Sequence, residues 1–166
     1  MKIITLSGDA TNPQLNPEND MNYIIHCCND AGKWGKGFVL PLASKWPRTK
    51  AAFKSLYTAK RLSSLGDNQY IVVEKNITVV NMIGQRGTYV KGSPPPIRYP
   101  AIQECLIKLS MQMRRKSPFH KNPAIHCPRF GTNLAGGSWE DIVKILKNVF
   151  NEVDINIYVY DYYGPH

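Results

Sequence analysis

The hydrophobic and polar positions of this chain alternate in blocks that have the length of single strands and helices. Apolar runs predict strands at 2–7, 22–28, 69–75, 77–83, 124–127 and 154–160, and those at 69–75 and 77–83 are rich in β-branched residues. Helices are expected at about 38–46, 48–62, 100–116 and 139–150, and in the last of these the apolar residues have helical spacing. Because almost only Asn76 separates 69–75 from 77–83, these two runs predict a hairpin. The run at 22–28 is apolar enough to be a strand buried on both faces.

The repeated strand–loop–helix order predicts an α/β fold. We expect three α/β/α layers, with a mixed, largely parallel central sheet and helices on both faces. The 166 residues have the usual size of one domain, 1–166, and contain no internal repeat, low-complexity tract or linker. Ser138 precedes the last helix, and we expect it to cap that helix with Asp141 as the acid of a capping box.

Composition limits where the protein works and what it binds. No apolar run approaches the ~20 residues that a membrane span needs, and the first residues are too soon polar for a signal peptide, so no membrane partner is expected. We expect a cytoplasmic monomer, located in the host cytoplasm if the chain is phage-encoded. The net charge of +9 favours a polyanionic partner, either nucleic acid or a pyrophosphate ligand. Nucleic acid is less favoured, because the basic stretches lack interleaved aromatic residues.

The four cysteines predict neither a metal site nor a redox site. No two of them have C-x-x-C spacing, so we expect reduced, buried thiols: Cys27, Cys28, Cys105 and Cys127. No other metal-ligating cluster is apparent in the sequence. We therefore expect no metal and no cofactor.

Two glycine-rich loops have the composition of an anion site. They cover 29–38 and 128–139, and each follows a predicted strand and leads into a predicted helix. Backbone N–H groups and the positive end of the helix dipole converge at such positions, and glycine lets phosphate oxygens approach closely. Neither loop has the G-x-x-x-x-G-K-[ST] or G-x-G-x-x-G pattern, and the chain contains no H-E-x-x-H or G-x-S-x-G motif.

Four blocks in order along the chain resemble the macrodomain family. They are IIHCCNDAGKWGKGFVLPLASKWP (24–47), NMIGQ (81–85), PIRYPAI (96–102) and PRFGTNLAGGSWEDI (128–142). The branch they resemble is the ADP-ribose-1″-phosphate phosphatase-like macrodomains of fungi, bacteria and phages. This resemblance implies a phosphatase that hydrolyses ADP-ribose-1″-phosphate to ADP-ribose and phosphate.

The resemblance also implies a role for each part of the ligand site. Asp9 in the segment GDAT (8–11) would hydrogen-bond the adenine amino group, with Ala10 beside it. Asn29 would hydrogen-bond the distal ribose, and Tyr160 would pack near the adenosine. The other implied ligand contacts are Gly35, Lys36 and Gly37 in the first loop, Gln85, and Gly131, Thr132, Asn133, Leu134, Ala135 and Gly136 around the diphosphate.

Catalysis would require a group that moves a proton. His26 matches a histidine of the phosphatase branch and is our candidate general acid or base, although a hydrogen-bonded core histidine would have the same sequence pattern. Asp30 is the second candidate, able to orient a water molecule or His26. A related branch hydrolyses glutamyl-ADP-ribose esters with a lysine and an aspartate. Gln85 and Ala135 stand at those positions here, which argues against the lysine mechanism.

Other functions would fit the same sequence. A reader of free or protein-linked ADP-ribose needs the two loops but no acid or base, and an ADP-ribosyl hydrolase is a further alternative. A nucleic-acid-binding protein driven by the net charge would need a basic patch away from the cleft.

Overall fold

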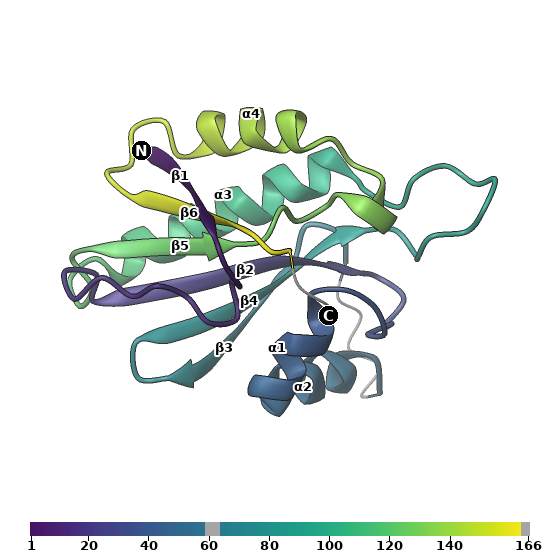
Figure 1. Ribbon diagram of the computed structural model, residues 1–166, viewed down its shortest axis with the longest axis horizontal. Helices are drawn as coiled ribbons and strands as arrows, with labels where there is room; N and C mark the ends of the chain where they lie inside the picture. Colours follow the sequence, from purple (N-terminus) through teal and green to yellow (C-terminus); the bar gives the residue numbers. More distant parts are fainter. Residues whose placement is uncertain (59–63, 164–166) are drawn as a thin grey trace.

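The computed structural model describes residues 1–58 and 64–163 as a six-stranded sheet between two layers of helices (Figure 1). The strands are β1 (Lys2–Ser7), β2 (Met21–Asn29), β3 (Asn68–Glu74), β4 (Ile77–Gln85), β5 (Pro123–Cys127) and β6 (Asn156–Asp161). Their order across the sheet is β1-β6-β5-β2-β4-β3, and neighbouring strands are parallel except for the antiparallel β3–β4 pair. The predicted mixed, largely parallel sheet is therefore confirmed.

Helices α3 (Tyr99–Lys116) and α4 (Trp139–Val149) cover one face of the sheet (Figure 1). Helices α1 (Val39–Lys45) and α2 (Pro47–Thr58) cover the other, and a short 3-10 helix, η1, spans Asn133–Ala135. Among the described residues, no helix is both long enough and apolar enough to cross a membrane.

Strand β2 shows why both faces need a cover. Tyr23 and Ile25 lie in the apolar cluster under α3 and α4, whereas Ile24 and Cys28 lie in the cluster against α1 and α2. Successive side chains of a strand point to opposite faces, so a run that is apolar throughout contributes to two cores at once. The expectation of a strand buried on both faces is confirmed.

The predicted elements agree with the structure to within about two residues at most ends. The part of the predicted second helix at 59–62 lies outside the described residues. The predicted capping box at α4 is wrong. Ser138 does occupy the N-cap position, but its side chain makes no capping hydrogen bond, and its backbone N–H donates instead to Tyr99 Oη at 2.8 Å.

The parallel strands place four connecting segments at one edge of the sheet. Strands β1, β2, β4, β5 and β6 all run in the same direction, so their carboxyl ends meet there. We refer to three of these segments as the first loop (29–38), the second loop (128–139) and the third loop (86–98), which connects β4 to α3. Ligands of open α/β sheets bind outside this edge.

Candidate functional site

The side chain of Asn29 folds the first loop. Its Oδ1 accepts hydrogen bonds from the N–H groups of Ala31 at 3.1 Å and Lys33 at 3.0 Å, and its Nδ2 donates to the Lys33 carbonyl at 2.9 Å. The carbonyl oxygen of the side chain is therefore occupied, and one amide hydrogen is left for a ligand. The predicted contact of Asn29 with the distal ribose stays a prediction, limited to that one donor.

The tip of the first loop is open. Gly35, Lys36 and Gly37 are exposed, and their N–H groups have no hydrogen-bond partner in the described part of the chain. A Cβ atom at Gly35 or Gly37 would meet nothing within 4 Å. A ligand can therefore approach this backbone closely.

The second loop presents a row of unpaired donors around η1. Within residues 1–58 and 64–163, the N–H groups of Gly131, Asn133 and Leu134 have no hydrogen-bond partner. Gly131 has a φ of 75°, and Asn133 has a φ of 55°, so the backbone turns through the left-handed region twice within three residues. Such turns gather successive N–H groups into a concavity that binds anions.

The other predicted residues of the second loop are distributed between its interior and its surface. Thr132 is half-buried, and its hydroxyl donates to the Arg129 carbonyl at 2.7 Å. Ala135 is buried, whereas Leu134 and Gly136 are exposed. Thr132 and Ala135 therefore shape the loop, and Leu134 stands on its open side. Gly136 instead packs against the third loop, since its N–H donates to the Asn133 carbonyl at 2.9 Å and a Cβ there would lie 2.6 Å from Cβ of Pro95.

The third loop joins the first loop to the second. Asp30 Oδ1 accepts the N–H of Gly87 at 2.7 Å, and the N–H of Asp30 donates to the Gln85 carbonyl at 2.9 Å. At its other end, the N–H of Ile97 donates to the Ala135 carbonyl at 3.0 Å. The predicted residues Asp30, Gln85 and Ala135 are thus brought together through this loop. The second oxygen of Asp30 and the side-chain amide of Gln85 have no hydrogen-bond partner among the described residues.

Asp9 lies after β1 at the same edge. Its Oδ1 accepts from both the N–H and the hydroxyl of Thr11, each at 2.8 Å, so one oxygen stabilises the local turn. Its second oxygen has no partner among the residues that the structure describes. Ala10 beside it is buried and helps to seat the turn. The predicted adenine contact of Asp9 would use the second oxygen.

Tyr160 contacts the segment that follows Asp9. Tyr160 is 3% exposed, and its hydroxyl accepts the N–H of Gln14 at 2.9 Å. The same hydroxyl lies 2.8 Å from Nδ1 of His126, whose Nε2 lies 2.8 Å from Asn22 Oδ1. Burial raises the pKa of Tyr160 to about 12, so this hydroxyl stays protonated and donates.

His26 lies under the first loop and is 2% exposed. Asn81 uses its Nδ2 to donate to Thr49 and Gln69, so its Oδ1 faces His26 and accepts from Nε2–H. The rings of Trp34 and Phe38 contact the imidazole at centroid distances of 5.7 and 5.5 Å.

Burial lowers the pKa of His26 to about 4, although the bond to Asn81 opposes this shift. At neutral pH the ring is therefore a neutral, fully packed group. Its role in proton transfer stays a prediction.

An ion pair connects the second loop to the end of β6. Arg129 Nε and Nη2 donate to the two carboxylate oxygens of Asp161 at 2.6 and 3.1 Å. These bonds lower the pKa of Asp161, so the pair is charged at neutral pH. The first part of the second loop is thereby attached to the sheet.

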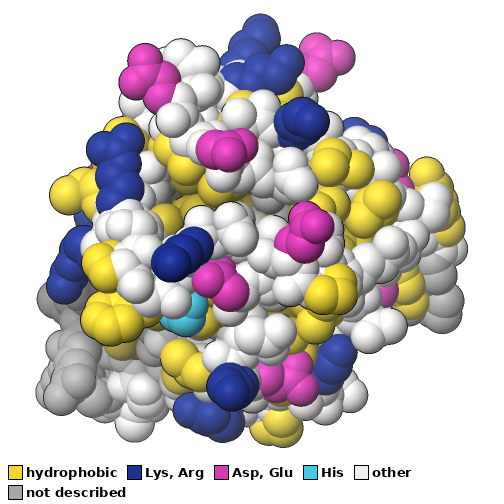
Figure 2. Space-filling model, turned by 90° about the vertical axis from the view of Figure 1, so that its left-hand side faces the viewer, with side chains coloured by type: hydrophobic (Ala, Val, Ile, Leu, Met, Phe, Trp, Pro, Cys, Tyr) yellow, Lys and Arg dark blue, Asp and Glu magenta, His cyan; other side chains and the backbone are white. Residues whose placement is uncertain are grey.

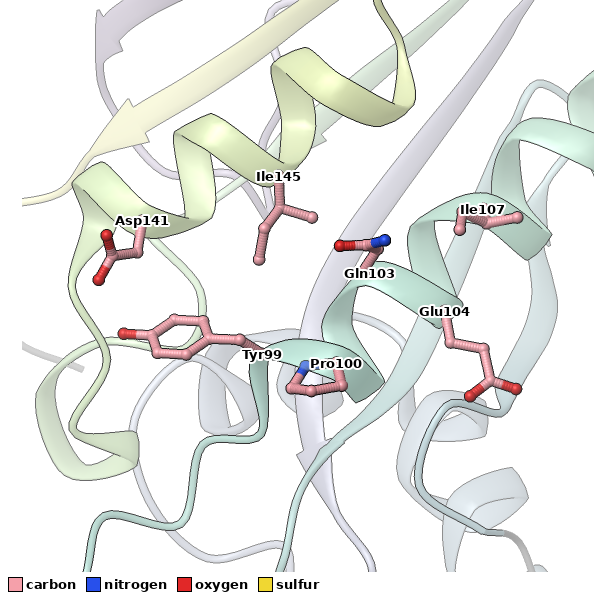
Figure 3. A pocket seen from close by; sticks show the side chains of 7 residues that line it. All are labelled: Tyr99, Pro100, Gln103, Glu104, Ile107, Asp141 and Ile145. Carbon is pink, nitrogen blue, oxygen red and sulfur yellow. The ribbon is translucent and has the colours of Figure 1, made fainter.

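A separate groove of about 500 Å³ lies between α3 and α4 (Figure 3). Its lining residues are Tyr99, Pro100, Gln103, Glu104, Ile107, Asp141 and Ile145. None of the predicted ligand residues is among them. Glu104 and Asp141 each pair with a lysine of their own helix, Lys108 and Lys144.

Comparison with solved structures identifies the family. A Bacteroides thetaiotaomicron protein of unknown function is 40% identical, with a TM-score of 0.86 over 97% of this chain and 98% of that chain. A macrodomain protein from Streptomyces coelicolor is 33% identical, with a TM-score of 0.79 over 98% of this chain and 100% of that chain. The chain belongs to the macrodomain family.

More distant macrodomain structures share the fold. Thermosipho africanus DarTG, solved in complex with ADP-ribose, is 13% identical, with a TM-score of 0.70 over 96% of this chain and 41% of that chain. At this identity the likeness concerns the fold alone.

Curated relatives are much longer than this macrodomain. Mouse chromodomain-helicase-DNA-binding protein 1-like is 26% identical over 170 residues, which cover 93% of this chain but 17% of that protein. The chain thus spans less than a fifth of the curated relatives it matches. No protein-family model matches the chain.

Three side chains that support the macrodomain's loops were not predicted from its sequence. Tyr57 Oη and Lys54 Nζ, both from α2, donate to the carbonyls of Asn29 at 3.0 Å and Gly32 at 2.7 Å. The guanidinium of Arg98 donates to carbonyls of the third loop. Their partners are backbone carbonyls, which a sequence does not distinguish, so no signal in the chain points to these contacts. In the described residues, no group of three or more His, Cys, Asp or Glu side chains could hold a metal ion.

Proposed function

We propose that this macrodomain binds ADP-ribose across the three loops at the carboxyl edge of its sheet. The observation that carries the proposal is the row of unpaired N–H groups at Gly131, Asn133 and Leu134. Free donors in an anion-binding turn fit a diphosphate, which has no hydrogen-bonding hydrogens of its own at neutral pH. The macrodomain identity of the chain and the ADP-ribose complex of DarTG support this choice of ligand.

The adenine and the distal ribose are placed at opposite ends of this sheet edge. The adenine lies at the end of the sheet where β1 and β6 pair, and its amino group donates to the free oxygen of Asp9. The open backbone of Gly35 and Gly37 receives the distal ribose at the β2–β4 end. The unpaired amide of Gln85 adds a donor and an acceptor there.

Hydrolysis of ADP-ribose-1″-phosphate is the second candidate function. The half-buried Asp30 favours it, since the free carboxylate oxygen lies on the first loop while the other oxygen is fixed by Gly87. A carboxylate held in this way orients a water molecule for in-line attack, and the exposed Lys36 offsets charge on the phosphate. His26 is a weaker choice for contact with substrate, because Asn81 holds its Nε2 proton and its ring is buried.

Calorimetry and phosphate release test the two functions separately. We expect wild type to bind ADP-ribose, and absence of binding would overturn the proposal. Phosphate release from ADP-ribose-1″-phosphate should be lost in Asp30→Asn, which keeps an acceptor for Gly87, while ADP-ribose binding persists. If wild type binds ADP-ribose but releases no phosphate from ADP-ribose-1″-phosphate, the phosphatase function is overturned and the protein is an ADP-ribose reader.

A further inference from the structure

The third loop projects away from the body of the molecule. Figure 1 shows it at the right of the view, reaching past the ends of the strands. We call residues 87–96 the finger. Its sequence is GTYVKGSPPP, and three consecutive prolines make its returning arm stiff.

The base of the finger is held at several points. Arg86 N–H donates to the Pro96 carbonyl at 2.9 Å, and the Arg98 guanidinium lies 2.7 Å from the Pro95 carbonyl and 3.1 Å from the Pro96 carbonyl. Gly87 donates to Asp30 in the first loop. The finger is therefore fixed relative to the site. Its first residue, Gly87, is bonded to the first loop, beside which the distal ribose is proposed to lie.

The tip of the finger is a defined turn. Ser93 N–H donates to the Val90 carbonyl at 3.0 Å, and Gly92 at the third turn position has a φ of 82°, which favours glycine. The turn leaves Tyr89 and Val90 55% and 57% exposed. An ordered turn that displays two adjacent apolar side chains suits recognition, because little conformational freedom is lost when a partner binds.

The surroundings of the finger are cationic. Segments 29–38 and 85–98 contain one acidic residue, Asp30. Their exposed cations are Lys33, Lys36, Arg86 and Lys91, and none of these forms an ion pair within the described residues. The opposite end of the sheet differs, since Figure 2 shows Lys and Arg interspersed with Asp and Glu on the face where β5 begins. The finger side therefore fits an anionic partner.

We propose that the finger docks the polypeptide to which ADP-ribose is attached, through an acidic segment with an apolar side chain that packs on Tyr89 and Val90. This proposal rests on ADP-ribose binding by the adjoining loops. A polypeptide fits better than a nucleic acid, since Val90 provides no flat face for a base and Tyr89 is one aromatic ring rather than a series. Free ADP-ribose would end before the tip, so the finger adds affinity only when a carrier is present.

The test compares free ADP-ribose with an acidic peptide carrying ADP-ribose through a non-hydrolysable bond. We expect wild type to bind the conjugate about tenfold more tightly than free ADP-ribose, an advantage that falls with added salt. The double variant Tyr89→Ser, Val90→Ser should lose this advantage and bind free ADP-ribose normally. Met111→Ser is the matched control, because Met111 is 57% exposed on α3 and should not contribute.

Equal affinity of wild type for conjugate and free ligand, or an unchanged advantage in the double variant, would overturn the role of the finger while ADP-ribose binding stands. Tighter binding of an oligonucleotide carrying the same ADP-ribose would overturn the choice of a polypeptide. Failure to bind free ADP-ribose at all would instead overturn the proposed function.

Discussion

The hydroxyl of Tyr160 lies 2.8 Å from Nδ1 of His126 and completes a directional chain of hydrogen bonds. Asn22 Oδ1 can only accept, so it takes the Nε2 proton of the neutral imidazole, and Nδ1 must accept from Tyr160. The Tyr160 oxygen in turn accepts the N–H of Gln14. Through this chain the core fixes the segment that carries Asp9.

Tyr160→Phe should therefore loosen the adenine side of the site. The change leaves the Gln14 N–H and His126 Nδ1 without partners, and we expect a loss of about 1–3 kcal/mol in the free energy of unfolding. ADP-ribose affinity should fall severalfold in calorimetry, with the preference for adenine over hypoxanthine in the ligand reduced.

Tyr158→Phe is the control for this change. Tyr158 lies on the same strand and its hydroxyl accepts from the side chain of Asn156, so its removal does not touch the Gln14 contact. Equal affinities in both variants would contradict a role for the chain in placing Asp9.

Stability should decrease between pH 7 and pH 5 because of His26 and His126. Burial lowers the pKa of each to about 4, from an ordinary value of 6.5, so the unfolded chain binds protons that the folded chain does not. The folded protein therefore keeps its full stability with respect to these two histidines above pH 6.5. Its free energy of unfolding decreases as the pH falls from 6.5 toward 4. Each histidine contributes about 2 kcal/mol to the loss by pH 5.

Denaturant unfolding at the two pH values measures this loss. His26→Gln keeps a donor opposite Asn81 but does not titrate, so it should roughly halve the dependence. Asp161 does not interfere between pH 5 and pH 7. The bond from Arg129 lowers the pKa of its carboxyl from the ordinary 3.8, so the stability that this carboxylate contributes is lost only below about pH 4. Equal stability at pH 7 and pH 5 would show that the histidines are solvated.

Gly35 and Gly131 should respond differently to replacement by alanine. A Cβ at Gly35 meets nothing within 4 Å, so Gly35→Ala should leave the melting temperature unchanged and weaken ADP-ribose binding by occupying ligand space. Gly131 has a φ of 75°, and a Cβ there would lie 2.8 Å from Cδ1 of both Ile97 and Ile142. Gly131→Ala should cost about 1–2 kcal/mol in the free energy of unfolding.

Thermal melts and calorimetry on this pair separate folding from binding. Unchanged ADP-ribose affinity in Gly35→Ala would remove the first loop from the proposed site. An unchanged melting temperature in Gly131→Ala would mean that the second loop adopts a different backbone.

The sequence predicts the sheet edge well, because this prediction needs only local patterns. Apolar runs locate the strands, and glycines mark the first and second loops directly after β2 and β5. The bridging role of the third loop was missed, since it depends on the contact between Asp30 and Gly87 across 57 positions. The environment of His26 was equally out of reach, because Asn81 lies on another strand and its own amide is oriented by Gln69.

Asn133 is the one non-glycine residue with positive φ in the described ranges, and its backbone presents a free N–H to the proposed diphosphate. Asparagine tolerates this conformation better than most residues, whereas a β-branched side chain does not. Asn133→Val should therefore cost about 1–2 kcal/mol in the free energy of unfolding and weaken ADP-ribose binding at least tenfold. Asn133→Gly keeps the conformation, and its stability and affinity should stay close to wild type.

The two variants separate backbone shape from side-chain chemistry at this position. Both remove the amide side chain, so a loss of affinity in Asn133→Val alone assigns the effect to the direction of the N–H group. If Asn133→Gly lost as much affinity as Asn133→Val, the side chain itself would be the ligand contact. Calorimetry with ADP-ribose and with ADP checks that the loss concerns the diphosphate, because both ligands contain one and a misdirected cradle should weaken both.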